Sequence, residues 1–471
     1  MLKVHFKRKS DKIDDENDKS LALRIGKFIL PLLMSGILQL LYNAADSIVV
    51  GNHDGPNALA AVTSVGALIN LLLNIFIGMS VGTAVCVAHD VGAKDEEGVH
   101  RDIHTSILLG LISGVVVGII GFIFSGTFLQ WMDSPEDVIG QSELYMKIYF
   151  IGTPANIIYN FGASIMRSLG ETKRPLYYLT FAGILNVILN IILVVGFNLG
   201  VAGVAVGTIV SQFVSAACII AYLIKRKDGA HFDFRKMRIY KEKLKKIVVV
   251  GLPAGLQGIA FSLSNVLIQS SVNSFGQYAM AGNGAAASIE GFTYIAMNSV
   301  YHASLTFVGQ SVGAKKYNRI GRIVATCLVF VIIIGIVLGY VSYFFGNQLL
   351  SLYIDSNSEG VDIAVSYGLL RMRYILLTYF IFGVMDVMVG AQRGMGMSFI
   401  PMANALIGTC LLRIVWISVV FPIFNTLDSV YISYPISWVI TLIAHSICYF
   451  IKLNKLKKEH ATEGDLIPEQ Q

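Results

Sequence analysis

The sequence predicts an all-α polytopic membrane protein with twelve transmembrane helices, arranged as two six-helix bundles related by a pseudo-twofold axis along the membrane normal. Three observations support this prediction. Long apolar stretches recur along the 471 residues, basic residues occupy only alternate connectors, and the second half repeats motifs of the first. The composition agrees, because 55% of the residues are hydrophobic and only 14% are charged. The mean hydropathy of +0.65 excludes an ordinary water-soluble protein.

Each apolar stretch is long enough to cross a bilayer, which takes about 20 helical residues. In chain order the predicted spans are 25–50, 57–88, 102–125, 143–166, 176–196, 201–224, 247–270, 278–307, 323–345, 361–392, 398–424 and 430–451. Because the number of spans is even, both ends of the chain are expected on the same side of the membrane.

Lysine and arginine lie almost entirely on one side of the predicted membrane. All but four of the 36 fall in the first tail, in every second connector after it, or in the last tail. The four exceptions lie within spans and are Lys147, Arg371, Arg373 and Arg413. By the positive-inside rule, both termini and the 225–246 connector are cytoplasmic, and the protein is a multi-pass plasma (inner) membrane protein. The net charge of +6 indicates contact with anionic lipid and no nucleic-acid partner.

Motifs of the first half recur in the second half. Val91-Gly92-Ala93-Lys94 matches Val312-Gly313-Ala314-Lys315, and Arg167, Gly170 and Pro175 match Arg393, Gly396 and Pro401. Two six-span copies that both start from the cytoplasm give parallel repeats with a cavity between them, a geometry typical of alternating access. The predicted parts are a tail at 1–24, a lobe at 25–224, a linker at 225–246, a second lobe at 247–453 and a tail at 454–471.

The sequence supports no catalytic, phosphate-binding or metal-binding motif. The G-x-S-x-G pattern at Gly78–Gly82 lies inside a predicted span, whereas a nucleophile elbow needs a strand–turn–helix. The sequence has no phosphate-binding loop and no H-E-x-x-H motif. The five cysteines are scattered singly, without the spacing of a disulfide framework or a zinc site. We therefore predict a non-enzyme without a cofactor.

A polar stripe runs along the first predicted span. Its members, at helical spacing, are Ser35, Gln39, Tyr42, Asn43 and Asp46. Lipid would reject this stripe, so it is expected to face water or protein. The alternative for Asp46 is a carboxylate simply solvated near the outer end of the helix, but the stripe that continues inward favours a functional role.

Neutral oxygen donors on two later spans complete a candidate cation site. Asn186 and Asn190 lie one turn apart on the fifth span, and Thr208 lies on the sixth. With Asp46 they form a set of hard oxygen donors suited to a small cation, or a desolvated carboxylate suited to a proton. The alternative for the asparagines is ordinary hydrogen bonding between helices, worth about 1 kcal/mol.

Charged residues within spans of the second half suggest the wall of a substrate cavity. Glu290 and Tyr294 lie on the eighth span, Asp386 on the tenth and Arg413 on the eleventh. We group them with Gln39, Tyr42 and Asn43 as candidate cargo contacts. The alternative is that Glu290 or Asp386 pairs with Arg413 only to orient helices.

The first span and several glycine-centred motifs resemble those of the multidrug and toxic-compound extrusion (MATE) transporters. The matching segments are Pro31–Gly51 with its Asp46, Ala58-Leu-Ala-Ala61, Val91–Lys94, Arg167–Gly170 with Pro175, and Val308–Lys315. The resemblance extends from about residue 24 to residue 453. It implies a V-shaped pair of six-helix bundles that exports organic, often cationic compounds in exchange for H⁺ or Na⁺.

The resemblance also implies roles for individual residues. Asp46, Asn186 and Thr208 match the amino-terminal cation site of the family, whereas Asn190 stands where the DinF-like branch usually has an aspartate. The span 247–270 contains no Asp or Glu, so the additional acid of the NorM-like branch is missing. This absence places the chain on the DinF-like side.

The expected function is therefore a monomeric secondary antiporter in which Pro31 is a hinge. In this mechanism neutralisation of Asp46 by H⁺ or Na⁺ lets the first helix bend. Its partners are small organic molecules and membrane lipids. Two other functions stay open: a flippase for a lipid-linked saccharide, which would need several cationic groups facing a pyrophosphate, and a sensor or scaffold that moves nothing.

Overall fold

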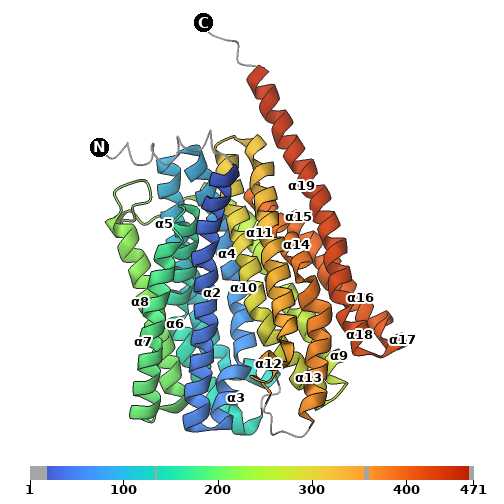
Figure 1. Ribbon diagram of the computed structural model, residues 1–471. Helices are drawn as coiled ribbons and strands as arrows, with labels where there is room; N and C mark the ends of the chain where they lie inside the picture. The colour runs from blue at the N-terminus through green and yellow to red at the C-terminus, as the bar shows by residue number, and fades with distance from the viewer. Residues whose placement is uncertain (1–17, 133–134, 355–359, 466–471) are drawn as a thin grey trace. The chain divides into compact units, whose positions relative to one another are not determined.

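The computed structural model describes residues 18–132, 135–354 and 360–465, which are helical without any strand (Figure 1). The first part comprises α2 (Asp18–Asp54), α3 (Pro56–Ser64), α4 (Gly66–Ala93), α5 (Glu96–Trp131), α6 (Glu136–Ser168), α7 (Lys173–Asn190), the π-helix η2 (Ile191–Gly196), α8 (Gly200–Lys225) and η3 (Phe234–Lys236).

The second part repeats this pattern of long helices with short interruptions. It comprises α9 (Lys241–Asn273), α10 (Gln277–Gly313), α11 (Tyr317–Phe344), α12 (Gly346–Leu350), α13 (Val361–Ile375), η4 (Leu376–Thr378), α14 (Tyr379–Gly394), α15 (Phe399–Ala405), the π-helix η5 (Leu406–Leu411), α16 (Leu412–Val419), α17 (Phe421–Phe424), α18 (Leu427–Tyr431) and α19 (Ser433–Asp465).

The twelve predicted spans each fall in a long helical segment, and the predicted fold class is confirmed. Ten segments of the described residues are long and apolar enough to cross a membrane. The other two spans lie in α6 and α10, which are 33 and 37 residues long and carry more polar side chains. Large apolar side chains point outward along the long helices. In α5, for example, Ile119 and Ile123 are 54% and 62% exposed. Such faces suit contact with lipid chains.

The chain divides into two compact units whose boundaries fall inside continuous helices. Residues 30–256 form one unit, and the other comprises the residues up to 29 and those from 257 onward. The boundaries lie in α2 and α9, beside Pro31 and Pro253, where a proline interrupts the helical hydrogen bonds. The lobes at 25–224 and 247–453, which were placed from span positions alone, stay a prediction.

The internal repeat is visible in the backbone. Left-handed or otherwise positive φ angles recur at matching positions: 85° and 89° at Gly55 and Gly276, 58° and 55° at Lys94 and Lys315, and 81° and 79° at Gly170 and Gly396. A π-helical turn interrupts the fifth span at η2 and the eleventh at η5. These particular irregularities therefore recur at corresponding steps of the two halves.

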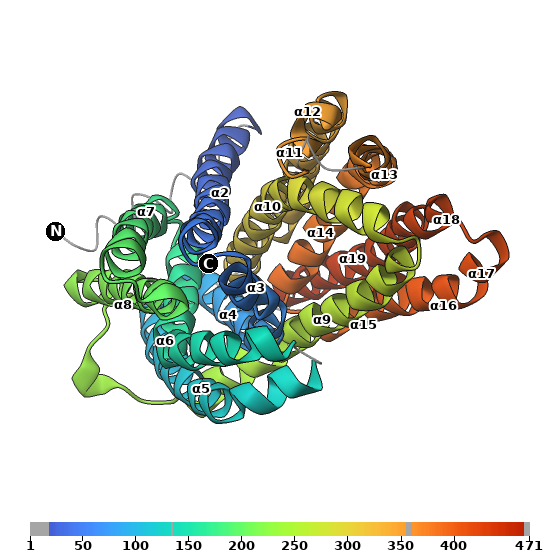
Figure 2. The ribbon, with the colours of Figure 1, turned by 90° about the horizontal axis from the view of Figure 1, so that it is seen from below.

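In the unit of residues 30–256, close helix packing depends on glycine. A Cβ atom on Gly78 of α4 would lie 2.1 Å from the backbone nitrogen of Gly255 in α9, and one on Gly114 of α5 would lie 2.5 Å from Cα of Pro154 in α6. Small residues let helix backbones approach this closely. The neighbouring α5 and α6 can be followed end-on in Figure 2.

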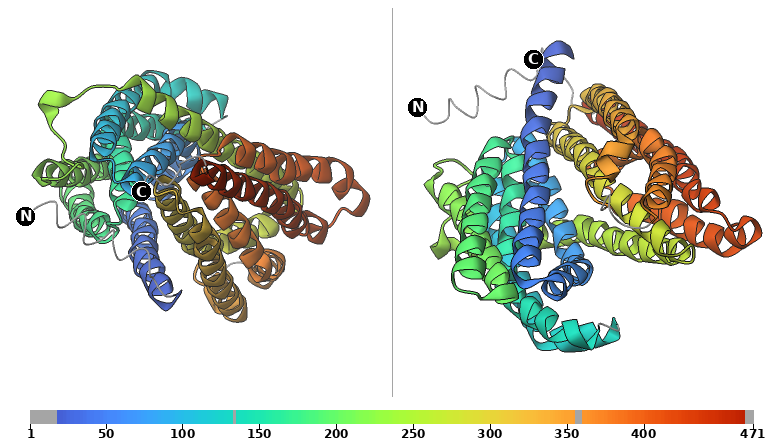
Figure 3. Two further views of the ribbon diagram at one scale, coloured as in Figure 1. Left: turned by 90° about the horizontal axis from the view of Figure 1, so that it is seen from above. Right: turned by 60° about the horizontal axis from the view of Figure 1, so that its bottom comes forward.

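In the other unit, α10 is central and packs against α11, α13 and α14. Gly282 of α10 again permits backbone contact, since a Cβ there would lie 2.1 Å from the carbonyl oxygen of Ala364 in α13. The last helices α15, α16 and α19 lie side by side in the end-on views (Figures 2 and 3). These contacts bring polar residues of α10, α13, α16, α18 and α19 to one region of the unit.

Candidate functional site

Asp46 lies at the centre of a polar cluster within the unit of residues 30–256. Its side chain is only 8% exposed. The Asn190 Nδ2 atom donates a hydrogen bond to Asp46 Oδ1, and the Thr208 hydroxyl donates to Asp46 Oδ2 at 3.3 Å. Asn186 Nδ2 donates to the Thr208 hydroxyl at 3.4 Å. The structure thus brings together the four residues that the sequence grouped, from α2, α7 and α8.

Two local features make room for this cluster. The α-helix α7 gives way to the π-helix η2 directly after Asn190, and such π turns are frequent at functional sites. Facing it, Gly207 of α8 leaves the space that the amide occupies, because a Cβ there would lie 2.3 Å from Asn190 Oδ1. Any larger residue at Gly207 would displace Asn190 from the Asp46 carboxylate.

Two amide oxygen atoms of the cluster accept no hydrogen bond from the described residues. Oδ1 of Asn186 and Oδ1 of Asn190 are buried and have no hydrogen-bond partner within the described part of the chain. With the Asp46 carboxylate they form one negative charge and two free amide oxygens, the ligand type that hard cations take. Unpaired buried carbonyl oxygens are rare, so these two atoms are candidate ligands for a cation.

The remaining members of the α2 stripe do not share one environment. Tyr42 donates a hydrogen bond to the carbonyl oxygen of Thr180 at 3.3 Å and its ring lies against Gly183 of α7. Ser35 donates to the carbonyl oxygen of Pro31 at 2.8 Å. Gln39 and Asn43 are exposed. The stripe therefore combines an inward part at Tyr42 and Asp46 with side chains that remain accessible.

In the second unit, Glu290 pairs with Arg371, not with Arg413 as the helix-orienting alternative required. Arg371 Nε and Nη2 donate to Glu290 Oε2 at 3.0 and 2.6 Å, and Nη1 donates to Asn283 Oδ1 at 2.8 Å. The hydroxyl of Tyr431 donates to the same Asn283 oxygen at 3.1 Å. In the sequence, Arg371 was noted only as a basic residue within a span. The signal that could have indicated its partners was the helical spacing of Asn283 and Glu290, which places both on one face of α10.

Asp386 and Arg413 take no part in that ion pair. Asp386 of α14 has a buried Oδ2 with no hydrogen-bond partner among the described residues. Arg413 is 4% exposed and donates from Nε to the Ser437 hydroxyl at 2.8 Å. Tyr294 is 45% exposed and packs on Phe382 with ring centroids 6.1 Å apart.

Two basic residues that the sequence analysis counted as connector charges are buried. Arg393, at the end of α14, is 6% exposed and donates to the Tyr301 hydroxyl at 2.7 Å and to Gln257 Oε1 at 2.9 Å. Lys243, near the start of α9, is 6% exposed and forms ion pairs with Asp90 of α4 and Asp102 of α5. Both fold back into helix contacts instead of remaining in solvent.

Lys147 and Arg373, by contrast, remain near the surface. Lys147 is 39% exposed and pairs with Glu143 one turn away, as expected for a side chain that snorkels. Arg373 is exposed. Arg371 is thus paired with Glu290 whereas Arg373 is exposed, so the two arginines of α13 do not share one environment.

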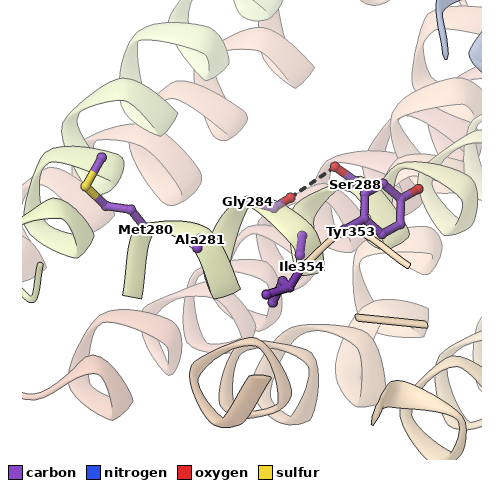
Figure 4. Close-up of a pocket in the computed structure, with 7 residues that line it drawn as sticks. Met280, Ala281, Gly284, Ser288, Tyr353 and Ile354 are labelled. Atoms are coloured by element: carbon purple, nitrogen blue, oxygen red, sulfur yellow. Dashed lines mark hydrogen bonds between the residues drawn. The ribbon is translucent and has the colours of Figure 1, made fainter. Parts of the chain in front are cut away.

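A pocket of about 460 Å³ lies on another face of α10. It is lined by Met280, Ala281, Gly284, Ala285, Ser288, Tyr353 and Ile354. Figure 4 shows Ser288 hydrogen bonded to the carbonyl oxygen of Gly284 on its wall. None of the predicted cargo residues lines this pocket, and its few polar groups give it no evident chemistry.

Comparison with known proteins decides the family. The family model MatE matches residues 31–192 and 253–419, which include Asp46 and both asparagines of the cluster. The chain belongs to the MatE family. It is a multi-pass membrane protein, and the MATE resemblance of its motifs is confirmed.

Two MatE relatives are named for drug resistance or drug export. The probable multidrug resistance protein YoeA of Bacillus subtilis (strain 168) is 29% identical over 376 residues, covering 78% of this chain and 80% of the relative. The multidrug export protein MepA of Staphylococcus aureus (strain MW2) is 21% identical over 424 residues, covering 89% and 90%. A solved MOP superfamily transporter from Pyrococcus furiosus matches 95% of this MatE chain and 99% of its own, with a TM-score of 0.87 at 21% identity. That structural likeness confirms the fold.

Proposed function

We propose that this MatE protein is a secondary active antiporter that exports organic, often cationic compounds across the plasma membrane in exchange for H⁺ or Na⁺. The observation that carries the proposal is the buried Asp46 carboxylate, ringed by the hydrogen-bond donors Asn190 and Thr208. A carboxylate in hydrocarbon costs several kcal/mol, so its retention within a span points to ion coupling. The names of the MatE relatives support export of drug-like compounds.

The ligand set supports one monovalent ion per cycle. Asn190 contributes a neutral amide where the DinF-like pattern has a carboxylate, so Asp46 is the single negative charge of the described cluster. One proton or one sodium ion would neutralise it. An ion that enters down about 100 mV supplies roughly 2.3 kcal/mol, and each tenfold gradient of cargo costs about 1.4 kcal/mol. One ion driven by the membrane potential therefore supports between one and two decades of gradient for an uncharged cargo, whereas export of a monovalent cation draws on the concentration gradient of the ion alone.

Pro31 connects the ion site to a change in helix shape. It lies inside α2, on the same helix as Asp46. A proline within a helix removes one backbone hydrogen bond and lowers resistance to bending. We infer that neutralising Asp46 weakens its hold on Asn190 and Thr208, so that the Asp46 half of α2 can bend at Pro31. Alternating access would follow from this movement, with both termini cytoplasmic.

Cargo would contact the polar and aromatic side chains that the sequence grouped as a cavity wall. In one unit these are Gln39, Tyr42 and Asn43, and in the other Glu290, Tyr294, Asp386 and Arg413. The protein would work as a monomer, with membrane lipid and small organic molecules as its partners.

The test is transport by the purified protein in liposomes. Efflux of the cationic dye ethidium is measured under a proton gradient alone, a sodium gradient alone, and no gradient. Antiport predicts gradient-driven efflux with one of the two ions and only passive leakage without either. Dye movement that is equal in all three conditions would contradict the proposal.

A further inference from the structure

Arg413 has an unusual environment for a buried arginine. It is 4% exposed, yet it forms no ion pair with a carboxylate of the described residues. Its Nη2 atom is buried without a hydrogen-bond partner in the described chain, while Nε donates to the Ser437 hydroxyl. A buried charge without a counter-charge is expensive, so such a group is expected to serve an anion.

The nearby charges do not balance. Arg371 donates two hydrogen bonds to the Glu290 carboxylate. The Tyr434 ring contacts both guanidinium groups, with its centroid 4.1 Å from Arg413 and 5.7 Å from Arg371. Two arginines therefore flank one ring and share one carboxylate. The cluster carries an excess positive charge close to Tyr434.

An aromatic surface adjoins this charge. The Trp438 ring lies 5.7 Å from the Arg413 guanidinium and contacts the rings of Tyr379 and Phe382 at 5.5 and 5.6 Å. Phe382 in turn contacts Tyr294, which is 45% exposed. The aromatic side chains thus run from the buried arginine to an accessible edge. The helices concerned, α14, α16 and α19, lie together in Figure 2.

We propose that Arg413, with Arg371 beside it, binds the anionic group of an aromatic cargo molecule whose ring packs against Trp438 and Phe382. A guanidinium binds a carboxylate through two parallel hydrogen bonds, and Arg413 still has a free Nη2 donor. Aromatic side chains favour a flat ring in offset or edge-on contact. Glu290, held by Arg371, would stay available to a positive group of the same molecule, so aromatic anions and zwitterions are the class that fits.

That this molecule is cargo rests on the proposed function, but its binding can be tested without transport. Purified full-length protein in neutral detergent is titrated at equilibrium with 2-naphthoate, and separately with the uncharged 2-naphthalenemethanol. Naphthoate is expected to bind at least about tenfold more tightly than the alcohol, because only the carboxylate engages Arg413. A loss of ion-driven efflux would overturn the proposed function and leave this result standing.

Arg413→Met tests the contact, and Arg373→Gln, which changes an exposed arginine of α13, is the matched control. Arg413→Met should weaken naphthoate binding about ten- to a hundredfold and leave the melting temperature unchanged or higher, because it removes an unpaired buried charge. Arg373→Gln should bind like the wild type. Arg413→Lys, which keeps the charge but loses the guanidinium fork, serves if the Met variant does not fold, and should weaken binding about tenfold.

Several results would overturn the proposal. Equal naphthoate binding by Arg413→Met and the wild type would remove Arg413 from the site. Equal binding of naphthoate and its alcohol would show that no anion is recognised. If inorganic phosphate or phosphatidylglycerol bound in an Arg413-dependent manner and naphthoate did not, the site would serve a phosphate group, and the aromatic class would be wrong.

Discussion

Replacing Lys243 by methionine should destabilise the protein by about 3–5 kcal/mol. Lys243 of α9 forms ion pairs with Asp90 and with Asp102 Oδ1, the latter at 3.3 Å, and Asp102 is fully buried. The methionine fills a similar volume but leaves two carboxylates together without their shared cation. Removal of one partner of a buried ion pair has this cost because the other charge stays buried. At roughly 2–4 °C per kcal/mol, the melting temperature should fall by about 10 °C.

The assay is thermal unfolding in detergent, followed with a thiol-reactive fluorophore that labels the buried cysteines, among them Cys86, as they become exposed. Lys245→Met, on the exposed face of the same helix, is the control and should melt within about 2 °C of the wild type. The double variant Lys243→Met/Asp102→Asn should recover more than half of the loss, since it also removes a buried charge. Equal melting temperatures for Lys243→Met and Lys245→Met would refute the argument.

Two further changes test the helix packing and the connector between α8 and α9. Gly78→Ala should destabilise by about 1–3 kcal/mol, because its Cβ would lie 2.1 Å from the Gly255 nitrogen, whereas Gly291→Ala, with nothing within 4 Å, should be neutral or stabilising in the same thermal assay. Burial opposes ionisation of Asp228, but the hydrogen bond and charge of Arg226 outweigh it and hold the Asp228 pKa below its usual value. The stabilisation by the ionised Asp228 carboxylate is present above its unfolded pKa of about 4 and is lost as pH falls through the lower folded pKa. The difference in stability between wild type and Asp228→Asn should therefore be seen at pH 7 and vanish near pH 2.

The span pattern could be predicted because it depends on local composition. A helix that crosses a membrane needs a continuous apolar run, and that run is legible without knowledge of its neighbours. The internal sequence repeat could also be predicted from the sequence. In the structure it corresponds to matching backbone φ angles, such as those of Lys94 and Lys315. Asp46 was grouped with Asn190 and Thr208 from the chemistry of their oxygen atoms, and the family resemblance then added support. Their contact itself could not be predicted from local composition, because three separate helices supply these residues.

Side-chain partners across helices were harder to predict. From the sequence, Glu290 could have paired with Arg371 or with Arg413. The packing of α13 against α10 brings Arg371 to the Glu290 carboxylate. Lys243 and Arg393 were counted as connector charges, since a count of basic residues cannot distinguish a lysine in solvent from one that folds back onto Asp102. The sequence thus located the charges along the chain, and packing decided their partners.

The role of Asp46 is tested most directly by comparing two variants of α2. Asp46→Asn removes the buried carboxylate, and Asp54→Asn removes an exposed one from the end of the same helix. Each is reconstituted in liposomes, and dye efflux is measured with and without the driving ion gradient. We predict that Asp46→Asn loses the gradient-dependent part of efflux while Asp54→Asn keeps it. Gradient-driven efflux by Asp46→Asn at the wild-type rate would contradict the account.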